Sequence, residues 1–69
     1  MKRKDQKRYE KAIQDKYGFT VVKWEQTKGN HIKAYINNGV DVKFVLMAST
    51  ASDHRAFKNS VAMAARVFN

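Results

Sequence analysis

Two histidines, His31 and His54, are the side chains of this sequence best suited to exchange protons near neutral pH. The chain has no cysteine, which excludes thiol catalysis, disulfide bonds and cysteine-ligated metal centres. His31 lies between Lys28 and Lys33, whose ammonium groups can hold a phosphate beside the imidazole. Such a setting can support general-base attack of an RNA 2′-hydroxyl on the adjacent phosphodiester. His31 is therefore the candidate catalytic residue, and the alternative is a surface polar residue beside a turn.

The only feature that suggests a functional role for His54 is its place at the start of a predicted helix. We expect it to be solvated, or to contact a phosphate if RNA approaches that helix. The two histidines are far apart in the sequence and have no carboxylate pair nearby, which makes a poor set of metal ligands. No metal ion and no cofactor is therefore predicted.

The charge balance favours an anionic partner. The chain has 69 residues, with 14 Lys+Arg against 6 Asp+Glu, and its formal net charge is +8. This length allows one domain, predicted to span residues 1–69 with a disordered start at 1–4. The basic N-terminus is followed by no apolar segment, and no stretch is apolar enough to span a membrane. We expect a small, soluble, cytoplasmic protein whose leading partner is nucleic acid.

Residues 2–17 have the pattern of an amphipathic helix, predicted from about residue 5 to residue 17. Half of the basic residues lie in this segment. Its apolar side chains recur at helical spacing, at Tyr9, Ala12, Ile13 and Tyr17. Gly18 suits the left-handed position just after a helix end. The segment also contains three acids, Asp5, Glu10 and Asp15. These can pair with the bases, so a solvated charged face is the alternative to a binding surface.

Between Phe19 and Met47 apolar and polar residues alternate, which predicts three strands in an antiparallel meander. The expected apolar faces are Ile32, Ala34 and Ile36 in the second strand, and Val40, Val42, Phe44 and Leu46 in the third. The first strand is ambiguous. Asn38-Gly39 predicts a tight type I′ turn between the second and third strands. We expect Trp24 in the core, and Tyr35 partly exposed on the face that carries His31 and Lys33.

The second helix is predicted from Asp53 to about Phe68, with Thr50 or Ser52 as its cap. Its apolar stripe consists of Phe57, Val61, Ala64 and Phe68, widened by Ala56, Ser60, Met63 and Val67. Two helices on one face of a three-stranded antiparallel sheet bury both stripes and leave the other sheet face open. This α+β fold, of order α-β-β-β-α, resembles the double-stranded-RNA-binding domain.

The resemblance implies that the first helix and the start of the second face RNA. The second helix begins beside Arg55 and Lys58, and the positive end of its dipole also favours phosphate. The candidate nucleic-acid-binding residues are Lys4, Lys7, Arg8, Lys11, Lys28, Lys33, Arg55 and Lys58.

Two short segments are similar to the HicA-type toxins. These segments are Gly18-Phe19 and, about ten residues later, Lys28-Gly29-Asn30-His31-Ile32-Lys33. HicA-type toxins are small basic mRNA endoribonucleases of the same fold, which inhibit translation and are neutralised by a HicB antitoxin. The resemblance implies that His31 is catalytic, because the family places its catalytic histidine directly after the glycine turn.

Residues 49–56, Ser-Thr-Ala-Ser-Asp-His-Arg-Ala, resemble instead phage and prophage proteins that use this fold without an antitoxin. The leading interpretation is a phage-encoded or mobile-element RNA-binding protein, with endoribonuclease activity left open. The alternative is an inhibitor or regulator that docks on a host protein through the open sheet face or a strand edge. A DNA-binding accessory protein is a third interpretation, although no recognition-helix pattern supports it.

Overall fold

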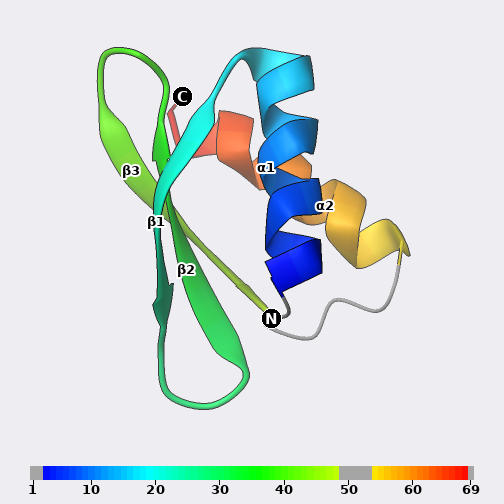
Figure 1. Cartoon of the computed structure of the whole chain (residues 1–69). Helices are drawn as coiled ribbons and strands as arrows, with labels where there is room; N and C mark the ends of the chain where they lie inside the picture. The colour runs from blue at the N-terminus through cyan, green and yellow to red at the C-terminus, as the bar shows by residue number, and fades with distance from the viewer. Residues whose placement is uncertain (1–2, 49–53, 69) are drawn as a thin grey trace.

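The computed structural model describes residues 3–48 and 54–68 of the chain. Two helices lie on one face of a three-stranded antiparallel sheet, in the predicted order (Figure 1). The elements are α1 (Arg3–Tyr17), β1 (Thr20–Gln26), β2 (His31–Asn37), β3 (Val42–Ala48) and α2 (His54–Arg66). The strands lie in the order β1-β2-β3, so β1 and β3 are the two edges of the sheet. Neither described helix is long and apolar enough to cross a membrane.

Helix α1 begins two residues earlier than predicted, so Arg3 and Lys4 are helical. It ends where predicted, because Gly18 takes a left-handed φ of 75°. The Gly18 N–H donates to the carbonyl of Gln14 at 2.8 Å, which satisfies one of the last carbonyls of the helix. The predicted apolar stripe is confirmed: Tyr9 and Ile13 are fully buried against the sheet and α2.

The core lies between the sheet and the two helices. It is formed by Tyr9, Ile13, Ile32, Ala34, Ile36, Val45, Met47, Val61 and Ala64. Tyr9 joins the layers, since its hydroxyl donates to the carbonyl of Ser60 at 3.1 Å and its ring meets Trp24 and Phe57 edge to face. Burial raises the pKa of the Tyr9 hydroxyl above its ordinary value, and the nearby Tyr17 adds to this. The hydroxyl therefore stays neutral and keeps donating its hydrogen bond to the Ser60 carbonyl of α2.

A β-bulge explains why the alternation in the first strand is ambiguous. The pairing of β1 with β2 shifts between Val21 and Lys23, so Val22 has no direct partner. The extra residue puts Val21 and Trp24 on the same side of the sheet, although they are three positions apart. Both are partly buried against the core, whereas Val22 is 56% exposed.

The second strand buries its predicted face, but the third strand buries the face opposite to the one predicted. Val45 and Met47 point into the core, where Val45 lies opposite Ala34. The side chains left exposed are Val42, Phe44 and Leu46. Residues that lie directly opposite each other on neighbouring strands point to the same face of the sheet. The loop between β2 and β3 holds an even number of residues, 38–41. Even-numbered residues of β2 therefore share a face with odd-numbered residues of β3.

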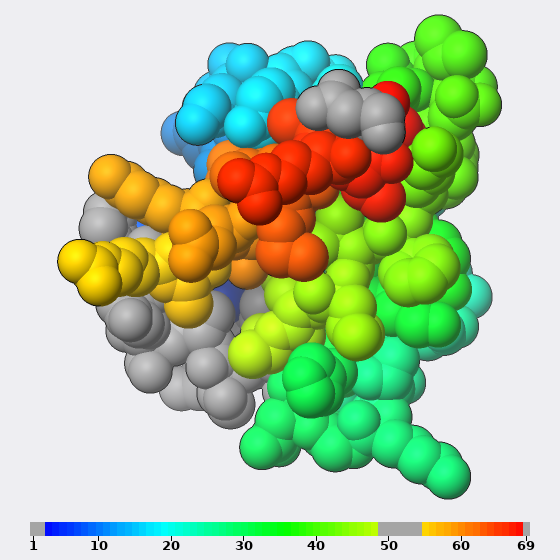
Figure 2. Space-filling view, turned by 180° about the vertical axis from the view of Figure 1, so that it is seen from behind, coloured from blue at the N-terminus to red at the C-terminus, as the bar shows by residue number. Residues whose placement is uncertain are grey.

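Helix α2 lies across the sheet, and its later turns, orange to red in Figure 2, border β3 in yellow-green. Val61 and Ala64 are buried as predicted, but Met63 is 39% exposed on the side of β3. The predicted caps, Thr50 and Ser52, lie outside the described residues.

The turn between β2 and β3 is not the predicted type I′ turn. That turn needs a positive φ at both central residues, and among the described residues only glycines have one. The loop is instead held by Asn38, whose N–H donates to the Asp41 carbonyl at 3.1 Å. The Asn38 side-chain oxygen accepts the N–H groups of Val40 and Asp41 at 2.9 and 2.7 Å. Gly39, with φ of 98°, supplies the left-handed position of this loop.

Replacing Gly39 with valine is expected to lower the free energy of unfolding by about 1 kcal/mol or more, because a β-branched residue strains a left-handed backbone. Gly39→Asn should cost less, since asparagine tolerates positive φ. Val40→Thr, in the same loop at an 86% exposed position, is the matched control and should leave stability unchanged. Urea unfolding followed by circular dichroism measures all three, and a Gly39→Val midpoint equal to wild type contradicts this account of the loop.

Candidate nucleic-acid interface

One side of α1 carries a stripe of exposed bases. Lys4, Lys7, Arg8 and Lys11 follow the spacing i, i+3, i+4 and i+7, and all four are exposed. This spacing places them on the side of the helix away from the buried Tyr9 and Ile13. The stripe is therefore fixed by the same helical repeat that buries the apolar residues.

The bases of this stripe are not neutralised by the acids of the same helix. Among the described residues of α1, no lysine or arginine forms an ion pair with Asp5, Glu10 or Asp15. Glu10 instead accepts the indole N–H of Trp24 at 2.8 Å. The i, i+3 and i, i+4 ion pairs expected for a solvated charged face are thus absent from the described part of α1, and its positive charge is open to an anion.

Two further exposed bases lie on the first turns of α2, which pack against α1. The guanidinium of Arg8 lies over the ring of Phe57 at 4.5 Å, which brings the middle of α1 against the first turns of α2. Arg55 and Lys58 flank Phe57 in sequence and are both exposed. We call the combined surface the basic face; its residues are Lys4, Lys7, Arg8, Lys11, Arg55 and Lys58.

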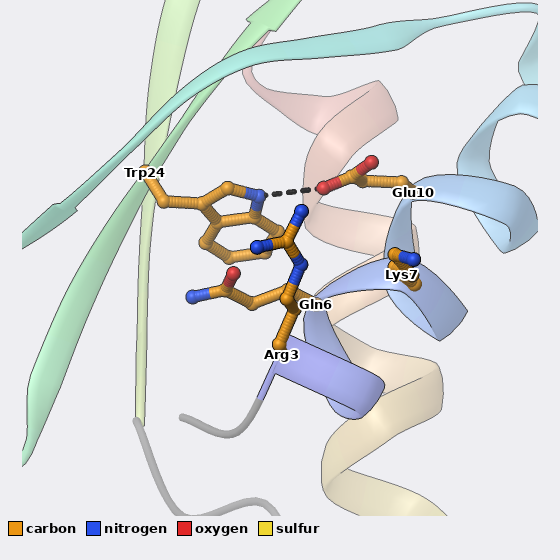
Figure 3. Close-up of a pocket in the computed structure, with 5 residues that line it drawn as sticks. All are labelled: Arg3, Gln6, Lys7, Glu10 and Trp24. Carbon is orange, nitrogen blue, oxygen red and sulfur yellow. Dashed lines mark hydrogen bonds between the residues drawn. The ribbon is translucent and has the colours of Figure 1, made fainter.

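A cavity of about 460 Å³ opens between the first half of α1 and β1 (Figure 3). It is lined by Arg3, Gln6, Lys7, Glu10 and Trp24. The hydrogen bond to Glu10 fixes the indole of Trp24, and Figure 3 shows the side chains of Arg3 and Gln6 beside that indole. Trp24 is therefore partly buried rather than fully in the core, and its remaining surface borders the cavity. Lys7 belongs to both the cavity and the basic face.

His31 and Lys33 lie elsewhere. Both are on β2 and alternate with the buried Ile32, so they share the open sheet face, which points away from the helices. His31 is exposed at the first position of the strand, and its carbonyl accepts the N–H of Thr27 at 3.1 Å and the amide of Gln26 at 2.9 Å. These bonds fix the backbone that carries the imidazole. The ammonium of Lys33 lies over the ring of Phe44 at 4.6 Å.

The structure thus places all but one of the predicted site residues in two groups. The basic face gathers six of them on the helices, and the open sheet face carries His31 and Lys33. Lys28 is exposed in the β1–β2 turn, which Figure 1 shows at the same end of the molecule as the start of α1. His54 is the first residue of α2. Among residues 3–48 and 54–68, no three acidic or histidine side chains gather where they could hold a metal ion.

Sequence reasoning missed the cavity. The sequence does show the α1 side of the cavity, as the helical spacing of Arg3, Gln6, Lys7 and Glu10. What the sequence does not show is that the β1 bulge brings Trp24 opposite that side. The chain matches no family model, and no curated protein or solved structure is significantly similar to it.

Proposed function

We propose that this protein is a small RNA-binding protein whose basic face contacts the phosphate backbone. The observation that carries the proposal is the run of exposed bases along α1, unpaired with the described acids of that helix and joined by two more on the first turns of α2. Positive charge gathered on one side of a small domain is the electrostatic footprint of nucleic-acid binding. The α-β-β-β-α order, in which two helices share a sheet face, supports RNA over DNA through its likeness to double-stranded-RNA-binding domains.

The cavity beside α1 adds a contact of a different kind. A base that leaves its helix can stack on the partly exposed indole of Trp24, because base–aromatic stacking tolerates any sequence. Arg3 and Lys7 stand at the same cavity and suit the phosphate of that nucleotide. RNA that contains a duplex with an unpaired end fits the basic face and the cavity together.

The finer form of the proposal is that the protein cleaves RNA as a HicA-type endoribonuclease, with His31 as the general base. His31 is exposed directly after the β1–β2 turn, and Lys28 and Lys33 lie near it in the sequence. Lys28 belongs to that turn and Lys33 to the same sheet face, so both can contact the substrate phosphate. The basic face binds RNA in this proposal whether or not cleavage follows.

The salt dependence of binding tests the proposal. We expect the affinity for a double-stranded RNA to fall linearly with salt in a log–log plot, with a slope of about −0.9 for each phosphate contacted. Fluorescence anisotropy with an RNA duplex that has an unpaired end, single-stranded RNA and duplex DNA of one sequence gives the three slopes. The proposal expects the tightest binding for the RNA duplex with an unpaired end. Equal affinity for all three nucleic acids, or an affinity independent of salt, counts against it.

A further inference from the structure

A second surface, on the far side of the molecule from α1, is apolar. Because β3 buries Val45 and Met47, its even-numbered side chains stand on the open sheet face. Val42, Phe44 and Leu46 are 53%, 46% and 44% exposed. Tyr35 on β2 extends the row, since its ring lies 5.9 Å from that of Phe44. Soluble domains rarely leave such a continuous row of large apolar side chains uncovered without an interaction to make.

The same strand is also an edge of the sheet. Within the described residues β3 pairs only with β2, so half of the backbone N–H and carbonyl groups of its seven residues point away from the sheet. Beside this edge, a groove of about 400 Å³ lies between β3 and the end of α2. It is lined by Phe44, Val45, Leu46, Met63, Arg66 and Val67. A strand added to β3 can therefore place alternate side chains on the open sheet face and in this groove.

The charges around this edge decide what can occupy it. Lys33 holds its ammonium over Phe44, Lys43 is exposed on β3, and Arg66 lines the groove. Glu25, the acid on the open sheet face, is already engaged by Lys23 at 3.5 Å and by the hydroxyl of Tyr35 at 3.3 Å. Asp41 is the nearest acid in the chain before β3 and lies in the loop. The edge is therefore apolar in the middle and positive around it.

We propose that β3 is a docking edge for an acidic, extended segment of a partner protein, with apolar residues at alternate positions. The segment adds a fourth strand to the sheet. Its apolar side chains cover Phe44 and Leu46 on the open sheet face, and its carboxylates, on the opposite face, meet Lys43 and Arg66. A second copy of this chain is disfavoured, because each copy carries a net charge of +8 and brings the same cations to the contact. The docking edge shares no residue with the basic face, so RNA held by the helices and the partner segment can bind together.

The experiment uses a nine-residue peptide that alternates valine and glutamate, with fluorescence anisotropy for affinity and amide NMR shifts for location. A peptide with lysine in place of glutamate tests charge, and one with a central proline tests strand pairing, because proline has no N–H to donate. We expect the acidic peptide to bind and to shift the amides of β3 and the end of α2. We expect the lysine and proline peptides to bind at least tenfold more weakly.

Two protein variants locate the contact. Phe44→Ser and Leu46→Ser should each weaken binding of the acidic peptide about tenfold or more. Either variant alone suffices if the other melts early by circular dichroism. Val22→Ser, at a somewhat more exposed apolar position on β1, is the control and should bind as wild type does.

Each contrary result overturns the proposal. One is no binding of the acidic peptide, and another is equal binding of the lysine peptide. A third is sedimentation as a dimer that Phe44→Ser returns to monomer, which makes a second copy the occupant. A fourth is loss of RNA affinity in Phe44→Ser and Leu46→Ser, which makes this edge a nucleic-acid surface. The proposal does not depend on RNA binding, so the peptide result still tests it if the protein fails to bind RNA.

Discussion

Removing four exposed lysines from the basic face is expected to weaken binding of double-stranded RNA about a hundredfold or more at low salt. The four lysines, replaced together by glutamine, are Lys4, Lys7, Lys11 and Lys58. Each ammonium that neutralises a phosphate releases counterions, so the log–log salt slope should become shallower by roughly 3 to 4. Arg8 is kept, because its guanidinium packs over Phe57 and its loss would also disturb the contact between the helices. Fluorescence anisotropy at several salt concentrations gives both quantities.

A second variant separates the position of the charge from its amount. It removes four positive charges from other surfaces, at Lys16, Lys23, Lys43 and Arg66. Both variants have the same formal net charge, so a binding mode that senses only the total charge weakens equally in the two. We expect the control variant to keep most of the wild-type affinity and slope. If the two variants are indistinguishable, or if both bind as wild type does, the basic face is not the RNA surface.

The second large effect concerns cleavage. If the protein is a ribonuclease, His31→Ala is expected to reduce the rate of RNA cleavage by about 10²–10⁴-fold, the usual contribution of a positioned general base. His31 is exposed at the start of β2, and the hydrogen bonds around it use its backbone carbonyl. Stability should therefore change little. Cleavage of a labelled mRNA by purified protein, and growth during expression, are the measurements.

His54→Ala is the control for this variant, and most of the activity should survive in it. RNA affinity is measured alongside, because loss of a general base slows cleavage without removing the basic face. The ribonuclease proposal is contradicted if wild-type protein leaves the labelled mRNA intact over hours and its expression does not slow growth. RNA binding is tested separately by the affinity measurements. Equal loss in both histidine variants would argue against the assignment of His31.

Local patterns determined much of the fold. Tyr9 and Ile13 repeat at helical spacing, Gly18 supplies the left-handed residue that ends α1, and alternation in β2 puts Ala34 in the core. Each of these features depends on residues a few positions apart, so the sequence contains the whole cause. The exposed stripe of α1 is of the same kind, because Lys4, Lys7, Arg8 and Lys11 must lie opposite the buried side.

Only the tertiary structure decided the features that depend on how separate segments meet. In β3 the apolar pattern of Val42, Phe44 and Leu46 favours burial, yet the register with β2 turns that face outward and leaves these side chains exposed. The β1 bulge places Trp24 opposite Glu10, whose carboxylate accepts the indole N–H where both residues line the cavity. Strand register and the packing of distant segments fix such outcomes, because a shift of one residue exchanges the two faces of a strand. The sequence therefore determined the elements and the charge on each, while the pairing of the strands decided which surfaces those charges and apolar side chains share.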